Sequence, residues 1–351
     1  MDARLQRNMV FLTNLYRRGP FERHAFVLST PPRPPIWEVG DYTNSDRPVK
    51  DWVPWVVEPY LRWMELSEQL QDDGMPTASP STGTHIYAAA MGCAVHNYEA
   101  TNPAAMPLVR SAAEADALPE PVVANCRNLM RIIELADLVR QELGPEAVLG
   151  PPDLQTGFDT ACLVWDKTDL CCAMYEHPAA VKRLAGKCAN LLRNFLLEFY
   201  REFPTAALAH CPQTWAPAEL GPWVSNDECG MMSVAMFEEF LLPELIELAE
   251  AFGGLGLHCC ADADHQFPSF RKIPNFTAFN RVPTKSGQGY DAMLEALGGP
   301  DGPVFVPWPP DEATVKMLLE KAPAGSRFIF HCPHQEPAAA QGWLERTRAL
   351  A

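Results

Sequence analysis

The amino-acid sequence predicts a single (β/α)8 barrel, an α/β fold in which parallel strands alternate with helices. Short apolar runs of strand length alternate with amphipathic stretches along nearly the whole chain, which is typical of a parallel sheet covered by helices. About eight such runs can be counted, the number that closes this barrel. The chain is 47% hydrophobic, and its 34 prolines are scattered rather than gathered into a linker. We therefore expect one domain over residues 1–351, with an N-terminal helical extension over about residues 1–30.

Each expected element follows from its local pattern. A proline in the first turn suits the start of a long helix at Pro178, and Gly144 ends the helix before it. Asn125 is a candidate cap for that earlier helix, and Ser233 for a later one. In chain order we expect helices at 4–17, 52–63, 83–92, 125–143, 177–200, 233–253, 290–297, 311–321 and 343–350, and strands at 34–39, near 76–80, and at 147–150, 206–209, 255–260, 276–280, 303–307 and 327–332.

Charge and cysteine content narrow the class of protein. The formal net charge of −16 argues against nucleic acid or an anionic membrane as the main partner. No apolar stretch approaches the roughly 20 residues of a membrane span, and the N-terminal segment lacks the apolar core of a secretory signal. Eleven cysteines, an odd number in a long chain without an export signal, indicate mostly reduced thiols, so we expect a cytoplasmic protein.

A strand that ends in metal-binding side chains is the main functional signal. Residues 255–260 form an apolar run that ends in His258, Cys259 and Cys260. Successive side chains of a strand point to opposite faces, so His258 and Cys260 are expected on one face and Cys259 on the other. Imidazole nitrogen and thiolate sulfur are donors that zinc prefers. An ambiguity of one residue in the register leaves open which of the two cysteines is the ligand.

A second strand, at 327–332, also ends in a His-Cys pair and offers Cys332 as a third ligand. Three protein ligands leave one position of a tetrahedral zinc ion open, as in catalytic zinc sites. Active sites of (β/α)8 barrels lie at the carboxyl ends of the strands, so we expect His258, Cys260 and Cys332 to meet there. The alternative is packing, because a His-x-Cys pattern arises easily among eleven cysteines and unpaired cysteines are commonly buried.

Three stretches carry a likeness to a known family: Pro35-Ile36-Trp37 followed by Tyr42, Met75-Pro76-Thr77 followed by Gly83 and 88–93, and 225–230 followed by 237–243. On these residues the chain resembles the uroporphyrinogen decarboxylase superfamily over nearly its whole length, which implies the same barrel fold. The family's decarboxylases carry arginines after the first strand and an aspartate after the second, whereas no arginine stands at 38–41 and no aspartate at 78–79. Decarboxylation of a porphyrinogen is therefore not expected, because an acidic pocket would repel its carboxylates.

Without the decarboxylase residues, the chain is similar to the methyltransferase branch of the superfamily, the relatives of methylcobalamin:coenzyme M methyltransferase. The resemblance implies zinc held by an H-x-C…C pattern at His258, Cys260 and Cys332. It also implies a methyl group moved between a corrinoid, either methylcobalamin or a corrinoid protein, and a thiol or other small acceptor. Zinc would activate the thiol as a thiolate. The alternatives are a carbon–carbon lyase acting on a non-porphyrin acid and a non-catalytic barrel that binds a small ligand.

Five further polar residues are candidates for the site. Asp227 could orient the substrate or a metal-bound histidine, and Glu228 could fill the fourth metal position, although acids before a helix also complement its dipole. His210 ends a strand and either lines the pocket or is a half-buried histidine. Gln155 and Asn280 follow strands and could bind a cofactor or substrate; a loop-capping role is the alternative for Gln155. The methyl donor, the acceptor and the oligomeric state, with a homodimer as one option, stay open.

Overall fold

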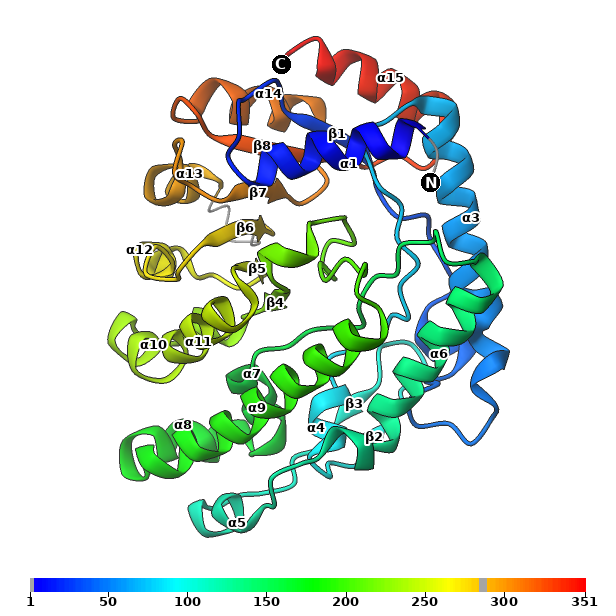
Figure 1. Ribbon diagram of the computed structural model, residues 1–351. Helices are drawn as coiled ribbons and strands as arrows, with labels where there is room; N and C mark the ends of the chain where they lie inside the picture. The colour runs from blue at the N-terminus through cyan, green and yellow to red at the C-terminus, as the bar shows by residue number, and fades with distance from the viewer. Residues whose placement is uncertain (1–2, 284–288) are drawn as a thin grey trace.

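The computed structural model describes residues 3–283 and 289–351. A curved parallel sheet is surrounded by helices (Figure 1), and the predicted (β/α)8 barrel is confirmed. Strands pair in the order β1-β8-β7-β6-β5-β4, and a separate antiparallel pair is formed by β2 and β3. The bounds are β1 (Ala25–Leu28), β2 (Val95–His96), β3 (Ala104–Ala105), β4 (Trp223–Ser225), β5 (Leu255–Cys259), β6 (Phe276–Arg281), β7 (Val304–Pro307) and β8 (Arg327–Cys332).

Helices cover the outer side of the sheet. The long helix expected from Pro178 is α9, and Ser233 caps α10 as expected, its hydroxyl accepting a hydrogen bond from the backbone N–H of Met236. The helices are α1 (Ala3–Tyr16), α2 (Ile36–Val39), α3 (Val53–Leu70), α4 (Ile86–Ala90), α5 (Ala112–Ala117), α6 (Arg127–Leu143), α7 (Gly157–Val164), α8 (Lys167–Glu176), α9 (Pro178–Glu202), α10 (Val234–Phe240), α11 (Leu242–Phe252), α12 (Phe267–Phe270), α13 (Asp291–Leu297), α14 (Glu312–Lys321) and α15 (Pro337–Arg348).

Between β4 and β1 the wall of the barrel is made of shorter extended segments. Ala78 and Leu149 form an isolated parallel bridge. The backbone N–H of Ala207 donates to the carbonyl of Leu149 at 2.9 Å, and the N–H of Trp223 donates to the carbonyl of Leu208 at 2.9 Å. The segment 206–209 therefore lies in the wall between the segment 147–150 and β4, and the strands expected near these positions are present as wall segments with few hydrogen bonds.

The prediction of a strand at 34–39 is wrong. Residues 36–39 form the short helix α2, which ends at Gly40 with a φ of +86°, and Ile36 is its one buried side chain. A short apolar run cannot be assigned to a strand or a helix by periodicity alone. The first strand is instead β1, all of whose residues are buried. It lies within the segment 1–30 that the sequence suggested as a helical extension.

Other elements also differ from the sequence-based expectation; the single helix expected at 233–253 is divided into α10 and α11 at Leu241. β4 has three residues, too few to show the alternation that identifies a strand. The helix α6 begins at Arg127, and its capping position is Cys126, without a side-chain hydrogen bond. Asn125 is not the cap because it ends the preceding 3-10 turn, η2 (Val123–Asn125).

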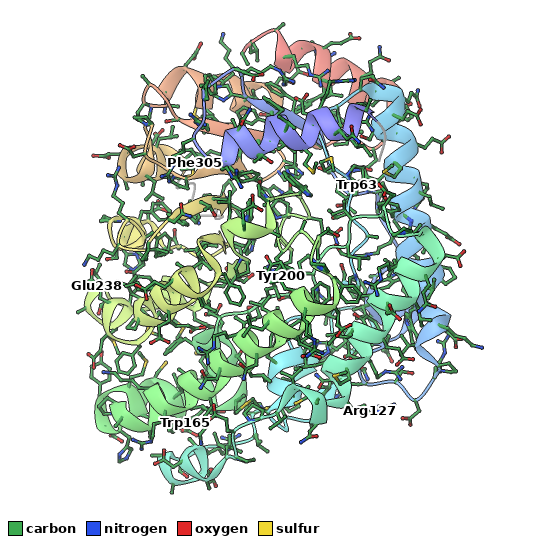
Figure 2. All side chains as sticks on the ribbon, viewed as in Figure 1. Trp63, Arg127, Trp165, Tyr200, Glu238 and Phe305 are labelled. Atoms are coloured by element: carbon green, nitrogen blue, oxygen red, sulfur yellow. The ribbon has the colours of Figure 1, made fainter. Side chains whose placement is uncertain are left out.

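Side chains of each strand alternate between two apolar layers. Phe328 and Phe330 of β8 belong to the layer between sheet and helices, whereas Ile329 belongs to the layer inside the barrel. Figure 2 shows side chains filling the space between the ribbons, with Trp63 of α3 and Phe305 of β7 labelled, both of which are buried in the outer layer. This alternation decides which strand residues face the interior and can contribute to a site there.

Helix α1 covers the end of the barrel at which the strands begin. Its buried residues Leu12 and Leu15 pack in the inner apolar layer, and it lies beside β1 and β8 in Figure 1. The Arg327 guanidinium, at the start of β8, donates to the carbonyls of Asn14 and Leu15 at 3.1 and 3.0 Å. The carboxyl ends of the strands are thus left as the open end. Within the described ranges, no helix has the length and apolar character needed to span a bilayer.

Candidate metal centre

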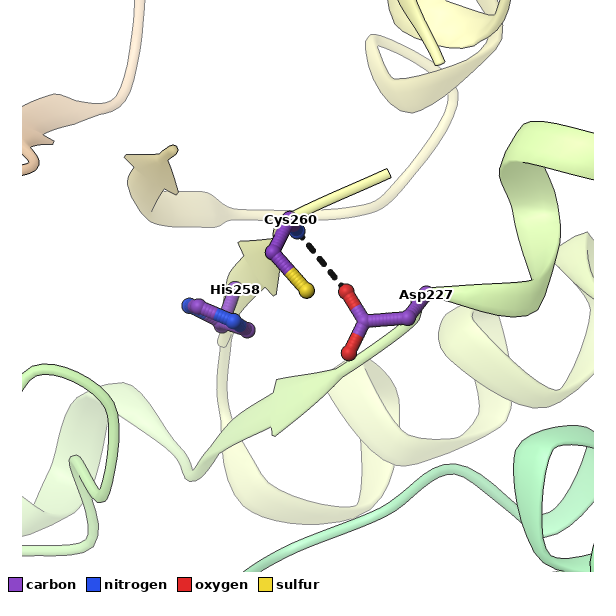
Figure 3. A group of neighbouring side chains, drawn as sticks. All are labelled: Asp227, His258 and Cys260. Atoms are coloured by element: carbon purple, nitrogen blue, oxygen red, sulfur yellow. Dashed lines mark hydrogen bonds between the residues drawn. The ribbon is translucent and has the colours of Figure 1, made fainter. Parts of the chain in front are cut away.

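Three donor side chains meet at the carboxyl ends of β4 and β5. Ser225 pairs with His258 in the parallel register of the two strands, so Asp227 lies beside Cys260 two residues further on. One donor atom each of Asp227, His258 and Cys260 lies within 4.8 Å of the others. In Figure 3 the thiol and the carboxylate point toward one another, and the imidazole lies on the same side. Imidazole, thiolate and carboxylate are all zinc ligands, so these residues fit a metal ion.

The hydrogen bond of His258 Nδ1 leaves the Nε2 lone pair available to a metal, with the Cys211 thiol 3.8 Å from Nε2. The Asn280 amide nitrogen donates to the carbonyl of Val306 at 2.5 Å, so the Asn280 amide oxygen faces the ring. This oxygen lies 2.5 Å from His258 Nδ1 and can only accept, so Nδ1 carries the proton. Nε2 therefore keeps its lone pair, the arrangement that metal-binding histidines usually have. Asn280, expected to bind a cofactor, lies behind the imidazole and orients it.

A buried acid on α7 holds the loop that carries Asp227. The Asp159 carboxylate accepts hydrogen bonds from the backbone N–H groups of Asp227, at 2.7 Å, and of Glu228, at 3.3 Å. Burial, and then the charge of Asp227, raise the pKa of Asp159 well above its ordinary value. Asp227 in turn accepts a hydrogen bond from the backbone N–H of Cys260 at 2.8 Å. The sequence does not single out Asp159, because an acid in the first turn of a helix resembles an ordinary helix terminus.

The Cys260 thiol of the donor group and the neighbouring Cys211 thiol are both protonated at neutral pH without a cation. Burial raises the pKa of Cys260, and the neighbouring Asp227 carboxylate raises it further. Cys211 lies with its Sγ 3.8 Å from His258 Nε2, and burial followed by the charges of Asp153 and Asp227 raises its pKa to about 12. A bound cation would reverse this effect, because a coordinating thiol loses its proton. The sequence placed Cys211 at a strand end beside His210 without assigning it a role.

Cys259 and Cys332 both point away from the donor group. Cys259 is buried, with its Sγ 3.8 Å from that of Cys229, so Cys260 is the thiol of β5 in the group. Cys332 is buried in the outer apolar layer with Phe330, and its Sγ lies 3.7 Å from the carbonyl of His334. The structure therefore does not bring Cys332 together with His258 and Cys260 as the sequence predicted.

His331, rather than Cys332, is the residue of this pair on the inner side of β8. It follows Ile329, which packs inside the barrel, by two residues. Its side chain is buried, and its Nε2 has no hydrogen-bond partner among the residues that the structure describes. Burial lowers its pKa to about 4, so the ring is neutral at physiological pH.

The remaining predicted residues lie around the group at different depths. His210 is close to it: its ring centroid lies 6.4 Å from that of His258, and its Nε2 lies 3.0 Å from the hydroxyl of Ser225. Burial lowers the pKa of His210. The backbone of Gln155 forms an isolated parallel β-bridge with Ser225 in the barrel wall. Glu228 lies outside the group, because its carboxylate accepts a hydrogen bond from Lys167 at 2.6 Å.

An arginine does follow the first strand, contrary to the sequence-based reading of 38–41. With β1 ending at Leu28, the next loop contains Arg33. Its guanidinium donates to the carbonyl of Ser79 at 3.2 Å and to the hydroxyl of Ser81, and lies over the Trp55 ring at 4.5 Å. Burial lowers the pKa of Arg33 to about 10, which leaves it charged at neutral pH. A fixed positive charge therefore lies near the open end of the barrel.

Comparisons with known proteins agree with this fold. The family model described as uroporphyrinogen decarboxylase (URO-D) matches residues 74–281. A methyltransferase from Methanosarcina mazei is similar in structure, with a TM-score of 0.68 and 13% sequence identity, over 97% of this chain and 98% of that chain. The homocysteine methyltransferase MmuM from Escherichia coli, apo form, has a TM-score of 0.21 and 16% identity over 48% of this chain and 75% of that chain, and supports no argument. No curated protein matches the chain.

Proposed function

The chain belongs to the uroporphyrinogen decarboxylase family, and on that premise we propose that it is a zinc-dependent methyltransferase acting between a corrinoid and a small thiol. The observation that carries the proposal is the meeting of His258, Cys260 and Asp227 within 4.8 Å at the end where barrel enzymes hold their active sites. The Methanosarcina mazei protein of the same fold is named a methyltransferase, which makes methyl transfer the first activity to test.

His258 and Cys260 would hold the zinc, with Asp227 beside them. When bound, zinc lowers the pKa of an incoming thiol and favours its thiolate. The Asp227 carboxylate is placed to accept the proton that the thiol loses and to pass it to water. Asn280 keeps His258 in the tautomer that leaves Nε2 unprotonated. The neutral rings of His210 and His331 add no positive charge that would compete with the cation.

The methyl transfer balances as a displacement. The thiolate sulfur donates its electron pair to the methyl carbon, so that a carbon–sulfur bond forms. The bond between that carbon and cobalt breaks, and its electron pair stays on cobalt. Either methylcobalamin or a corrinoid protein could supply the methyl group. The barrel residues contribute positioning and exclusion of water, which favour a displacement in line.

The test measures zinc content and methyl transfer on the full chain. Wild-type protein is expected to bind zinc and to demethylate methylcobalamin in the presence of one member of a panel of small thiols. Cys260→Ser is expected to lose both properties. Cys172→Ser is the matched control, because Cys172 is an exposed cysteine on α8. Equal turnover by the Cys260→Ser and Cys172→Ser variants would refute the proposal.

A carbon–carbon lyase acting on a small carboxylic acid is the second candidate, and Arg33 is the observation in its favour. Its charged guanidinium near the open end could pair with a substrate carboxylate. Release of carbon dioxide from a panel of carboxylic acids, abolished by Arg33→Met and independent of zinc, would favour the lyase. Methyl transfer that survives Arg33→Met would favour the first candidate.

A further inference from the structure

The nitrogen of His258 that is free to bind a metal has a second sulfur beside it. Cys211 Sγ lies 3.8 Å from His258 Nε2. In a tetrahedral zinc site, with zinc–sulfur and zinc–nitrogen bonds of about 2.3 and 2.0–2.1 Å, the sulfur and nitrogen ligands lie about 3.6 Å apart. Cys211 and His258 are therefore at nearly the separation of two ligands of one ion, whereas Cys211 lies outside the group whose donor atoms are all within 4.8 Å of one another, so its thiol must move closer to Cys260 and Asp227 when an ion binds.

The backbone before Cys211 is anchored in the barrel wall. The segment 206–209 is hydrogen-bonded on both sides, through Ala207 to Leu149 and through Leu208 to Trp223. His210 Nδ1 lies 3.1 Å from the carbonyl of Trp223 and donates to it, since a carbonyl oxygen only accepts; Nε2 then accepts from the hydroxyl of Ser225. Cys211 thus reaches the same end of the barrel as Cys260 from a segment fixed against β4.

Cys332 could join His258 only if β8 changed its register. β8 pairs with β1 so that Cys332 lies opposite Leu28, and both side chains belong to the outer apolar layer. A shift of one residue would carry Cys332 inward, but it would also turn Ile329 out of the inner layer and Phe330 into it. The packing of β8 therefore keeps Cys332 away from the donor group.

From this geometry we propose that Cys211, and not Cys332, supplies the second thiolate of the metal centre. The ligand set is then His258, Cys260 and Cys211, with Asp227 in the fourth position until a substrate thiol displaces it. Two thiolates and a neutral imidazole balance the double charge of zinc, and Asp227 adds one negative charge until it is displaced. This assignment rests on the proposed function for the identity of the metal and of the incoming thiol.

The experiment counts sulfur ligands by X-ray absorption at the zinc edge on the full-length, zinc-loaded protein without substrate. The wild-type protein is expected to show two sulfur ligands, Cys211→Ser one, and Cys332→Ser two. The exposed cysteine variant Cys172→Ser should also show two. A count of two in Cys211→Ser, or a loss of one sulfur in Cys332→Ser alone, would overturn the assignment.

A second variant separates a ligand from a residue that merely supports the fold. Cys211→His keeps a donor of the right kind, so it should bind zinc more tightly than Cys211→Ser while its sulfur count falls to one. Zinc affinity of Cys211→Ser should fall more than the roughly 10–100-fold typical of lost outer partners. Equal affinities of the two variants would count against a ligand. Methyl transfer is assayed separately: a zinc protein with two sulfur ligands that transfers no methyl group would refute the proposed function and leave the ligand set standing.

Discussion

Replacing Asn280 by leucine tests the tautomer argument for His258. The leucine removes the acceptor for Nδ1–H and the donor for the carbonyl of Val306, both of which are buried. Loss of a partner that orients a metal-binding histidine costs about 10–100-fold in metal affinity, or about 1.4–2.7 kcal/mol. The unpaired buried groups should also lower the free energy of unfolding by about 1–3 kcal/mol each.

Zinc affinity is measured by competition with a chromophoric chelator, and stability by denaturant unfolding of the zinc-free protein. Asn128→Leu is the matched control, because Asn128 is also buried and donates to the backbone carbonyl of Ile86 at 2.6 Å, on α6. It should lower stability and leave zinc affinity unchanged. If Asn280→Leu binds zinc as tightly as Asn128→Leu does, Asn280 does not orient His258 and the reasoning fails.

Three more predictions follow from the same contacts. Zinc affinity should rise with pH by about tenfold per unit for each thiol that must lose a proton. Because the pKa values of Cys260 and Cys211 are both raised, a plot of log affinity against pH from chelator titrations at neutral to mildly alkaline pH should have a slope near two. A slope near one would show that Cys211 is not a ligand. The pKa of Asp159 is raised in the folded protein, so its favourable contribution to stability is complete below the unfolded pKa and is lost as pH rises toward the folded pKa. The free energy of unfolding of Asp159→Asn should therefore rise relative to that of wild type between pH 4 and 8. A difference between the two proteins that does not change with pH would contradict the shift. Leu12→Ala should cost about 2–5 kcal/mol of stability, because Leu12 is buried in the inner layer, yet should not change zinc affinity; a change would show that α1 acts on the metal centre.

The sequence predicted the fold and the face of β5 well, because both depend on local periodicity. Alternation along 255–260 placed His258 with Cys260, but the choice between Cys259 and Cys260 as the ligand stayed open until the structure showed Cys259 facing Cys229. On β8 the same rule gave no answer, since apolar side chains at 328–330 fill layers on both sides of the strand and do not show which face is the interior. The ligand expected at Cys332 therefore depended on its place at a strand end and on the resemblance, and neither shows which face of β8 it occupies.

Residues brought in by long connections were beyond reach of the sequence. Cys211 meets His258 only because the segment 206–209 inserts into the wall next to β4, a pairing between short stretches that carry no pattern of their own. Asp159 acts through the backbone of residues 227 and 228, and nothing in its own helix indicates that contact. Arg33 was overlooked because the sequence predicts a strand over the residues of α2, and the first loop was therefore expected after that segment.

The packing of α1 beneath the strands covers the end of the barrel where the strands begin, so the barrel is open at its other end only in the sense that the carboxyl ends of the strands are not covered by α1. Reactants that bind at the donor group would then enter and leave at the carboxyl ends of β4 and β5. A corrinoid protein of the proposed function that docks over these strand ends would exclude bulk water from the donor group for as long as it stays bound. Exchange of one reactant for the next would in that case require the carrier to leave.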